Sequence, residues 1–249
     1  MPDSERRLIV NADDFGQSPG VNRGIIEAHE RGIVTSASLM VRWPAARAAA
    51  EYARSHPALG VGLHLDLGEM RYLEEEENWV EIYEVVPHGD PAAVRQEVAR
   101  QLADFFTAVG RAPTHLDSHQ HVHTHEPVRT ILLELAASLA IPLRSCSPTI
   151  GYCGDFYGQA SKGYAYPEGI SVGQLLQILA SLPPGTTELA CHPGLGEDVD
   201  SMYRTERATE VQTLCDPRVR PALEASKIRL ISFREAGPFA SCDSASGRM

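Results

Sequence analysis

The sequence has few cysteines and none of the spacings by which cysteines organise a small fold. The chain of 249 residues holds five of them, an odd number, and no two stand in a C-x-x-C pair. A dispersed, odd set argues against a disulfide framework and against a zinc site made of cysteines. The fold must therefore depend on a hydrophobic core, and apolar residues make up 43% of the chain.

Long apolar runs are missing as well. No stretch approaches the roughly 18 apolar residues that a membrane-spanning helix needs. The first residues, MPDSERR, are not followed by the apolar segment of a signal peptide. We therefore expect a cytoplasmic protein without a membrane span.

Basic residues are scarce beside acidic ones, since 22 Lys and Arg stand against 33 Asp and Glu, a formal charge of −11. Such a chain repels polyphosphates and anionic lipids, so we expect neither nucleic acid nor an anionic membrane as a partner. Part of the acidity is local, because residues 74–77 are four consecutive glutamates. A run of this kind is typical of a solvated loop.

Short apolar segments alternate with helical patterns along most of the chain. The apolar segments predict strands at residues 7–12, 35–41, 59–66, 114–120, 142–147, 186–193 and 228–233. Helix starts are predicted at Ser18-Pro19, Pro44, Asp90-Pro91, Pro127 and Ser171, and helix ends at Gly32 and Gly110. This alternation predicts an α/β fold with a mainly parallel sheet, closed or nearly closed into a barrel. We expect one domain over residues 1–237 and a disordered tail over residues 238–249.

Two segments lack the alternating pattern. Residues 67–89 show no clear periodicity and are predicted to be a loop. Residues 148–169 are rich in Gly and Tyr and are too long for a simple connection, which is typical of a lid over a functional site.

Polar residues that could do chemistry stand where the predicted strands end. These segments read NADDFG at residues 11–16, GLH at 62–64, HLDSHQHVH at 115–123 and CHPG at 191–194. In parallel α/β folds the carboxyl ends of the strands form the active site. Four strands would therefore bring Asp or His side chains to one face of the sheet.

Two histidines and one carboxylate make a divalent metal site that leaves room for water and substrate. Asp14, His64 and His119 could supply such a site from three strands. The neighbouring Asp13 would then be free to take a proton, which suits hydrolysis by metal-activated water.

Each of these elements also has an ordinary structural interpretation. The Asp pair could form a turn or cap a helix, His64 could be a core histidine, and CHPG could be a turn. The region 115–125 holds five histidines at a spacing of two, and one metal cannot use them all. We take His119 as the ligand, while His115 and Asp117 share its parity and would line the barrel interior.

The four motifs, in this order, resemble those of the YdjC-type carbohydrate deacetylases, which include chitooligosaccharide and hopanoid-associated deacetylases. The segment from Arg207 to Leu214 resembles the R-x-x-E-x-x-x-L pattern of that family, and ISFR at residues 231–234 is similar too. The resemblance covers residues 7–236. The segment 148–169 matches no signature of the family, which leaves the exact substrate open.

The resemblance implies a distorted TIM-like barrel that removes acetyl groups from N-acetylated amino sugars. It implies one divalent ion, Mg²⁺ or Zn²⁺, on Asp14, His64 and His119. Asp13 would be the general base and His192 the general acid. Arg207 would orient Asp13 or contact the substrate. Apart from the resemblance, we expect His115, Asp117 and Tyr157 to support the site or bind the substrate.

Several alternatives stay open. A metal-dependent phosphoesterase and a non-catalytic sugar-binding protein could use a similar barrel, whereas a serine hydrolase lacks its G-x-S-x-G elbow here. The aromatic residues of the two long segments could stack on a sugar or pack only their own loops; they are Trp79, Tyr152, Phe156, Tyr157, Tyr164 and Tyr166. The sequence leaves the oligomeric state open, with a homodimer as one alternative.

Overall fold

The centre of the structure, a computed structural model, is the strand β1 (Arg6–Phe15), which is buried from Leu8 to its end. A strand that is buried on both faces reads as an apolar run, as residues 8–12 do. The structure describes residues 5–196 and 198–236, so the tail predicted for residues 238–249 lies outside the described residues.

The elements follow one another in the predicted alternation. The strands are β1, β2 (Ser36–Leu39), β3 (Gly60–Leu65), β4 (Gly68–Leu73), β5 (Asn78–Glu84), β6 (Leu116–Ser118), β7 (Ile150–Cys153), β8 (Gly185–Cys191) and β9 (Ile228–Leu230). The helices are α1 (Pro19–Glu30), α2 (Ala46–Ser55), α3 (Pro91–Val109), α4 (Val128–Leu139), α5 (Val172–Ser181), α6 (Glu206–Leu214) and α7 (Val219–Ala225). The short 3₁₀ turns are η1 (His119–Thr124), η2 (Ser161–Gly163), η3 (Pro167–Ile170) and η4 (Phe233–Glu235).

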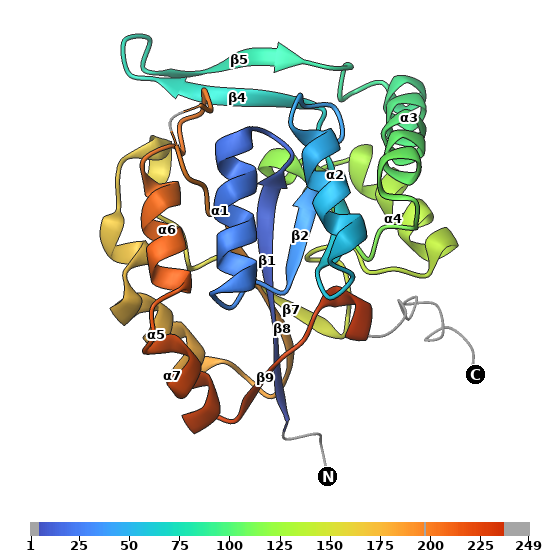
Figure 1. The fold of residues 1–249 in the computed structure, drawn as a ribbon. Helices are drawn as coiled ribbons and strands as arrows, with labels where there is room; N and C mark the ends of the chain where they lie inside the picture. The colour runs from blue at the N-terminus through green and yellow to red at the C-terminus, as the bar shows by residue number, and fades with distance from the viewer. Residues whose placement is uncertain (1–4, 197, 237–249) are drawn as a thin grey trace, which may run out of the picture.

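The main sheet is parallel and runs in the order β6-β3-β2-β1-β8-β7, with β9 paired to the first residues of β1. It curls into a half-barrel whose outer side is covered by helices (Figure 1). No pairing within the described residues joins β6 to β7, so the half-barrel stays open there. The prediction of a mainly parallel, distorted barrel is confirmed.

Most helix signals act as predicted. Ser18, Asp90 and Ser171 each cap a helix by accepting hydrogen bonds from backbone N–H groups of its first turn. Gly110 ends α3 at a left-handed φ of 75°, which glycine adopts without steric cost. The helix that was predicted to begin at Pro44 is α2, which begins at Ala46 instead.

Two predictions about the sheet were wrong. Residues 67–89 form the antiparallel hairpin β4–β5, which lies across the end of the sheet where β1 and β2 terminate (Figure 1). Most side chains of β5 are exposed, so no alternation of apolar residues marks it. The strand predicted at 142–147 is reduced to a single bridge between Leu143 and Leu116, and β7 is the strand that pairs with β8.

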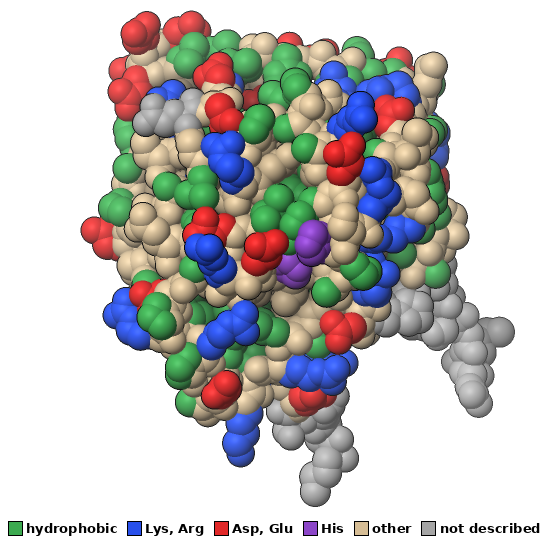
Figure 2. Space-filling model, in the orientation of Figure 1, with side chains coloured by type: hydrophobic (Ala, Val, Ile, Leu, Met, Phe, Trp, Pro, Cys, Tyr) green, Lys and Arg blue, Asp and Glu red, His purple; other side chains and the backbone are tan. Residues whose placement is uncertain are grey.

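The four consecutive glutamates form the exposed turn between β4 and β5, and acidic side chains gather at that corner of the molecule (Figure 2). The prediction of a solvated loop is confirmed for this turn. None of the helices within residues 5–196 and 198–236 is both long and apolar enough to cross a membrane.

Candidate active site

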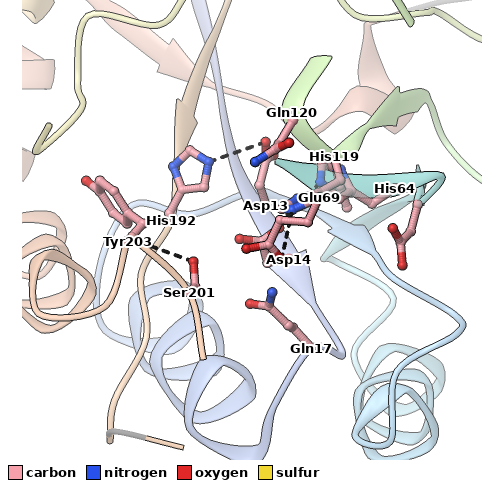
Figure 3. Close-up of polar contacts among 12 residues, drawn as sticks. Asp13, Asp14, Gln17, His64, Glu69, His119, Gln120, His192, Ser201 and Tyr203 are labelled. Atoms are coloured by element: carbon pink, nitrogen blue, oxygen red, sulfur yellow. Dashed lines mark hydrogen bonds and ion pairs between the residues drawn. The ribbon is translucent and has the colours of Figure 1, made fainter. Parts of the chain in front are cut away.

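Polar side chains from four strand ends meet beneath the hairpin β4–β5. Asp13 and Asp14 belong to the end of β1, and His64 belongs to β3. His119 is the first residue after β6, and His192 is the first residue after β8. All five line one pocket, which confirms that the strand ends deliver these side chains to one place (Figure 3).

Asp14 has one carboxylate oxygen that is held and one that is free. Its φ of 66° is left-handed, a conformation that Asp tolerates better than most residues. Arg207 donates a hydrogen bond to Oδ2 at 2.6 Å, while Oδ1 is buried without a hydrogen-bond partner. Oδ1 lies 3.4 Å from Nε2 of His64 and 3.3 Å from Nδ1 of His119. Ligand atoms about 2.0–2.1 Å from a tetrahedral metal ion stand about 3.3 Å apart, so these three atoms fit a cation.

A second carboxylate fixes the ring of His64. The Nδ1 atom of His64 lies 2.8 Å from Oδ1 of Asp117, which leaves Nε2 directed at Asp14. A carboxylate behind a histidine in this way is typical of metal ligands, because it sets the ring orientation and its basicity. Burial by itself would lower the pKa of His64, but Asp117 and Asp14 outweigh it and raise the pKa to about 10. The excess negative charge around the ring is what a bound cation would neutralise.

Two overlapping groups within the described residues could hold a metal ion, namely Asp14, His64 and His119, or Asp13, His64 and Asp117. The second group is already committed, because Arg144 and His64 engage its carboxylates. The first group has the free carboxylate oxygen. The geometry therefore favours the ligand set predicted from the sequence.

Asp13 is held by Arg144, a residue that the sequence analysis missed. The buried guanidinium of Arg144 donates two hydrogen bonds to Asp13, at 2.6 and 2.7 Å, and also contacts Asp117 at 2.9 Å and Glu188 at 2.7 Å. Burial by itself would raise the pKa of Asp13, but the charge and hydrogen bonds of Arg144 hold it below its usual value. Asp13 is therefore a fixed, ionised carboxylate at neutral pH.

One signal in the sequence does indicate Arg144. It lies directly after Leu143 in a segment that was predicted to be a strand, so it is a polar residue close to a predicted strand end. Its three carboxylate partners come from distant parts of the sequence, and no spacing rule predicts those pairs.

Arg207 contacts Asp14 rather than Asp13, which corrects the expectation that it orients Asp13. The reason is that Arg144 already occupies both oxygens of Asp13. Burial by itself would raise the pKa of Asp14, yet the charge of Arg207 and the two nearby imidazoles keep it well below its usual value. Arg207 also lines the pocket, so a contact with substrate stays a prediction.

His192 faces Asp13 from the opposite side of the pocket (Figure 3). Its Nε2 lies 3.7 Å from Oδ2 of Asp13, and its Nδ1 is buried without a hydrogen-bond partner. Burial, only partly offset by Asp13 and Asp14, lowers the pKa of His192 to about 4. The imidazole is therefore neutral at pH 7 in this state of the site.

The remaining predicted residues lie around this centre. His115 lies outside the pocket, where its Nε2 is 2.9 Å from Oγ of Ser38 and its ring stacks on Phe233. Tyr157 lines the pocket, and its ring makes a T-shaped contact with that of His192 at a centroid distance of 5.5 Å. His115 and Asp117 thus support the site from behind, whereas Tyr157 faces any molecule that enters.

Glu69, on the unpredicted strand β4, also lines the pocket. Arg71 donates to its Oε1 at 2.6 Å, while its Oε2 is buried without a partner and lies 3.9 Å from Nε2 of His119. Because residues 67–89 were predicted to be a loop, no strand end was expected to bring a carboxylate here.

The sequence of this chain is similar to those of known proteins. Residues 7–225 match the model of a family described as YdjC-like protein. A carbohydrate deacetylase of Geobacillus stearothermophilus is 36% identical over 92% of this chain and 98% of its own length. A chitooligosaccharide deacetylase of Salmonella paratyphi B is also 36% identical, with the same shares covered.

A solved structure agrees over nearly the whole fold. It is a protein of Enterococcus faecalis with the provisional name cellobiose-phosphate cleavage protein. The two share 28% sequence identity with a TM-score of 0.74, and the match covers 94% of this chain and 100% of that one.

The three-residue ligand set predicts the result of a metal-binding experiment. Replacing His64 or His119 by Ala should remove most of the bound divalent metal, because each histidine supplies one of three protein ligands. Elemental analysis after loading and dialysis measures the occupancy. The control is His56→Ala, since His56 directly follows the last residue of α2 and is not among the residues that line the pocket. This substitution should leave the metal occupancy unchanged. Full occupancy in both ligand variants would show that the ligand set is wrong.

Arg144 is predicted to be essential for stability. Replacing it by Met leaves three buried carboxylates without their counter-charge and should lower the free energy of unfolding by about 3–5 kcal/mol. Urea denaturation followed by circular dichroism measures the change. The matched control is Arg47→Met, since Arg47 is exposed and, within the described residues, pairs with the half-exposed Glu51, and its effect should stay within about 0.5 kcal/mol. Equal effects of the two substitutions would contradict the assignment.

Proposed function

The chain belongs to the YdjC-like family, and from this membership and the site geometry we propose that it is a metal-dependent deacetylase of N-acetylated amino sugars. The observation that carries the proposal is the division of the two adjacent carboxylates. Asp14 directs a free oxygen at two imidazoles, whereas Asp13 is held by Arg144 and faces His192.

Hydrolysis of an acetamide needs an electrophile, a base and an acid. A divalent ion on Asp14, His64 and His119 would supply positive charge that polarises the carbonyl and stabilises the oxyanion. Asp13, kept ionised by Arg144, takes a proton from the attacking water. His192 gives a proton to the amine nitrogen, and acetate leaves.

The low pKa of His192 determines when its proton arrives. With a pKa of about 4, the imidazole holds no extra proton at pH 7 before the reaction begins. The proton would then reach it during the reaction, and Asp13 could supply it after deprotonating the water, since its Oδ2 lies 3.7 Å from Nε2 of His192. Base and acid would then act in sequence on one proton.

The shape of the pocket favours a sugar. Trp79 from the hairpin lines it, together with Tyr152 and Tyr157. Flat aromatic faces stack on sugar rings, and their polar atoms can bond hydroxyl groups. Phe156 lines the pocket but is buried, whereas Tyr164 and Tyr166 do not line it. We therefore propose a short N-acetylglucosamine compound, such as a chitooligosaccharide or a glucosamine conjugate, as the substrate.

The two alternative functions are less well supported. Among the described residues that line the pocket, Lys162 and Arg207 are the Lys and Arg side chains, and Arg207 is already engaged by Asp14. A phosphoesterase would need more positive charge around its substrate. A non-catalytic sugar-binding protein would not need both an ionised base and a histidine opposite it.

The separate roles of base and ligand predict a separable loss of activity. Asp13→Asn and His192→Ala should keep the metal and lower kcat by a factor of about 10² to 10⁴, as expected for general acid–base groups. Single-turnover rates and metal content are measured on the same preparations. Asp104→Asn, an exposed carboxylate on α3 that pairs with Arg100, serves as the control. A near-normal rate in either variant would exclude the role assigned to it.

The substrate proposal is tested by acetate release. Protein loaded in turn with zinc, magnesium, cobalt or manganese is incubated with N-acetylglucosamine, diacetylchitobiose and longer oligomers, and free acetate and amine are measured. We expect release from at least one of these with at least one metal. If none is deacetylated while a phosphate ester is cleaved, the protein is a phosphoesterase instead.

A further inference from the structure

We propose that Glu210 is a positioning residue for the general acid His192, an inference that rests on the proposed deacetylase function. Glu210 lies on α6 and is fully buried. It takes no part in the chemistry described above. Its carboxylate instead holds the segment on which His192 stands.

Both carboxylate oxygens of Glu210 are engaged by donors that surround His192. Oε2 accepts a hydrogen bond from the backbone N–H of His192 at 2.5 Å. Oε1 accepts a short hydrogen bond from the hydroxyl of Tyr203. Burial raises the pKa of Glu210 to about 8, while the hydrogen bonds from Tyr203 and the backbone of His192 oppose the rise, so these two donors stabilise the ionised form. A buried carboxyl group is costly unless its oxygens accept hydrogen bonds. Glu210 therefore favours the backbone position in which the N–H of His192 reaches it.

Glu210 and Arg207 act from the same face of α6, because residues three apart on a helix are neighbours. Arg207 holds the carboxylate of Asp14 at 2.6 Å, and its own backbone carbonyl accepts a hydrogen bond from Gly194 at 3.2 Å. One helix thus fixes the proposed metal ligand of β1 and both ends of the segment from His192 to Gly194.

The aromatic rings of Tyr203 and Tyr157 lie beside the ring of His192, and Tyr203 also contacts Glu210. Tyr203 lies 5.3 Å from it between centroids, and Tyr157 stacks on Tyr203 at 4.6 Å. The Tyr203 hydroxyl also accepts a hydrogen bond from the backbone N–H of Gly158 at 2.8 Å. The imidazole has no side-chain partner within hydrogen-bond distance in the described part of the chain, so backbone anchoring and these rings determine its direction toward Asp13.

A comparison of two leaving groups tests the proposal. The amine of an acetamide must be protonated to leave, whereas the phenolate of 4-nitrophenyl acetate leaves without an acid. A misplaced acid should therefore slow acetamide hydrolysis and spare ester hydrolysis. Both reactions are measured with the metal-loaded full chain, after subtraction of the ester hydrolysis that remains in His64→Ala.

Glu210→Gln keeps the shape of the side chain but places an N–H₂ group where one acceptor stood. We expect kcat for the acetamide to fall at least about tenfold with KM changed by less than about threefold, since small misplacements of a catalytic group cost this much. Hydrolysis of the ester should stay within about threefold. Tyr203→Phe removes one of the two partners of Glu210 and should show the same selective loss to a smaller extent.

The matched control is Thr213→Val on the same helix. Thr213 is buried and donates to the carbonyl of Ile170 at 2.7 Å, and in the described part of the chain it makes no hydrogen bond to His192 or Tyr203. It should leave both reactions unchanged. The proposal is overturned if Glu210→Gln and Tyr203→Phe slow both reactions equally, if neither slows the acetamide, or if Thr213→Val reproduces the selective loss. Absence of acetamide hydrolysis by the unmodified protein overturns the deacetylase proposal and this inference with it.

Discussion

Two buried arginines hold two neighbouring carboxylates of one strand in different surroundings, and the site depends on this arrangement. Arg144 engages both oxygens of Asp13, whereas Arg207 engages a single oxygen of Asp14 and leaves the other free. The left-handed backbone at Asp14 separates the two side chains. Without Arg144 and Arg207, two adjacent carboxylates at low dielectric would repel each other, and one of them would bind a proton.

The cluster as a whole carries more negative than positive charge, which explains why a cation fits it. Asp117 and Glu188 also contact Arg144, so one guanidinium serves three buried carboxylates. Burial raises the pKa of Glu188 to about 7, and the neighbouring Asp117 and Asp13 add to the rise, whereas Arg144 opposes it. Buried charges of this kind contribute little to stability compared with apolar packing. Their retention is therefore better explained by the geometry that they impose on the site.

The sequence predicted the residues of the site better than their partners. Alternating strands and helices predicted a parallel sheet, and the rule for strand ends then brought Asp13, Asp14, His64, His119 and His192 together, as the structure does. The rule for strand ends missed Arg144, because the contacts of Arg144 join segments far apart in the chain. The predicted partner of Arg207 was wrong for the same reason. The hairpin β4–β5 was missed because a largely exposed ribbon has no apolar periodicity, and Glu69 was missed with it.

The central claim is that Asp14, and not Asp13, binds the metal. The most direct measurement is anomalous diffraction from crystals of the protein grown with zinc or cobalt, recorded at the absorption edge of the metal. The account predicts one peak bounded by Oδ1 of Asp14 and by His64 and His119, with Asp13 still paired to Arg144. A peak among Asp13, His64 and Asp117, the other group that could hold a metal, would contradict it.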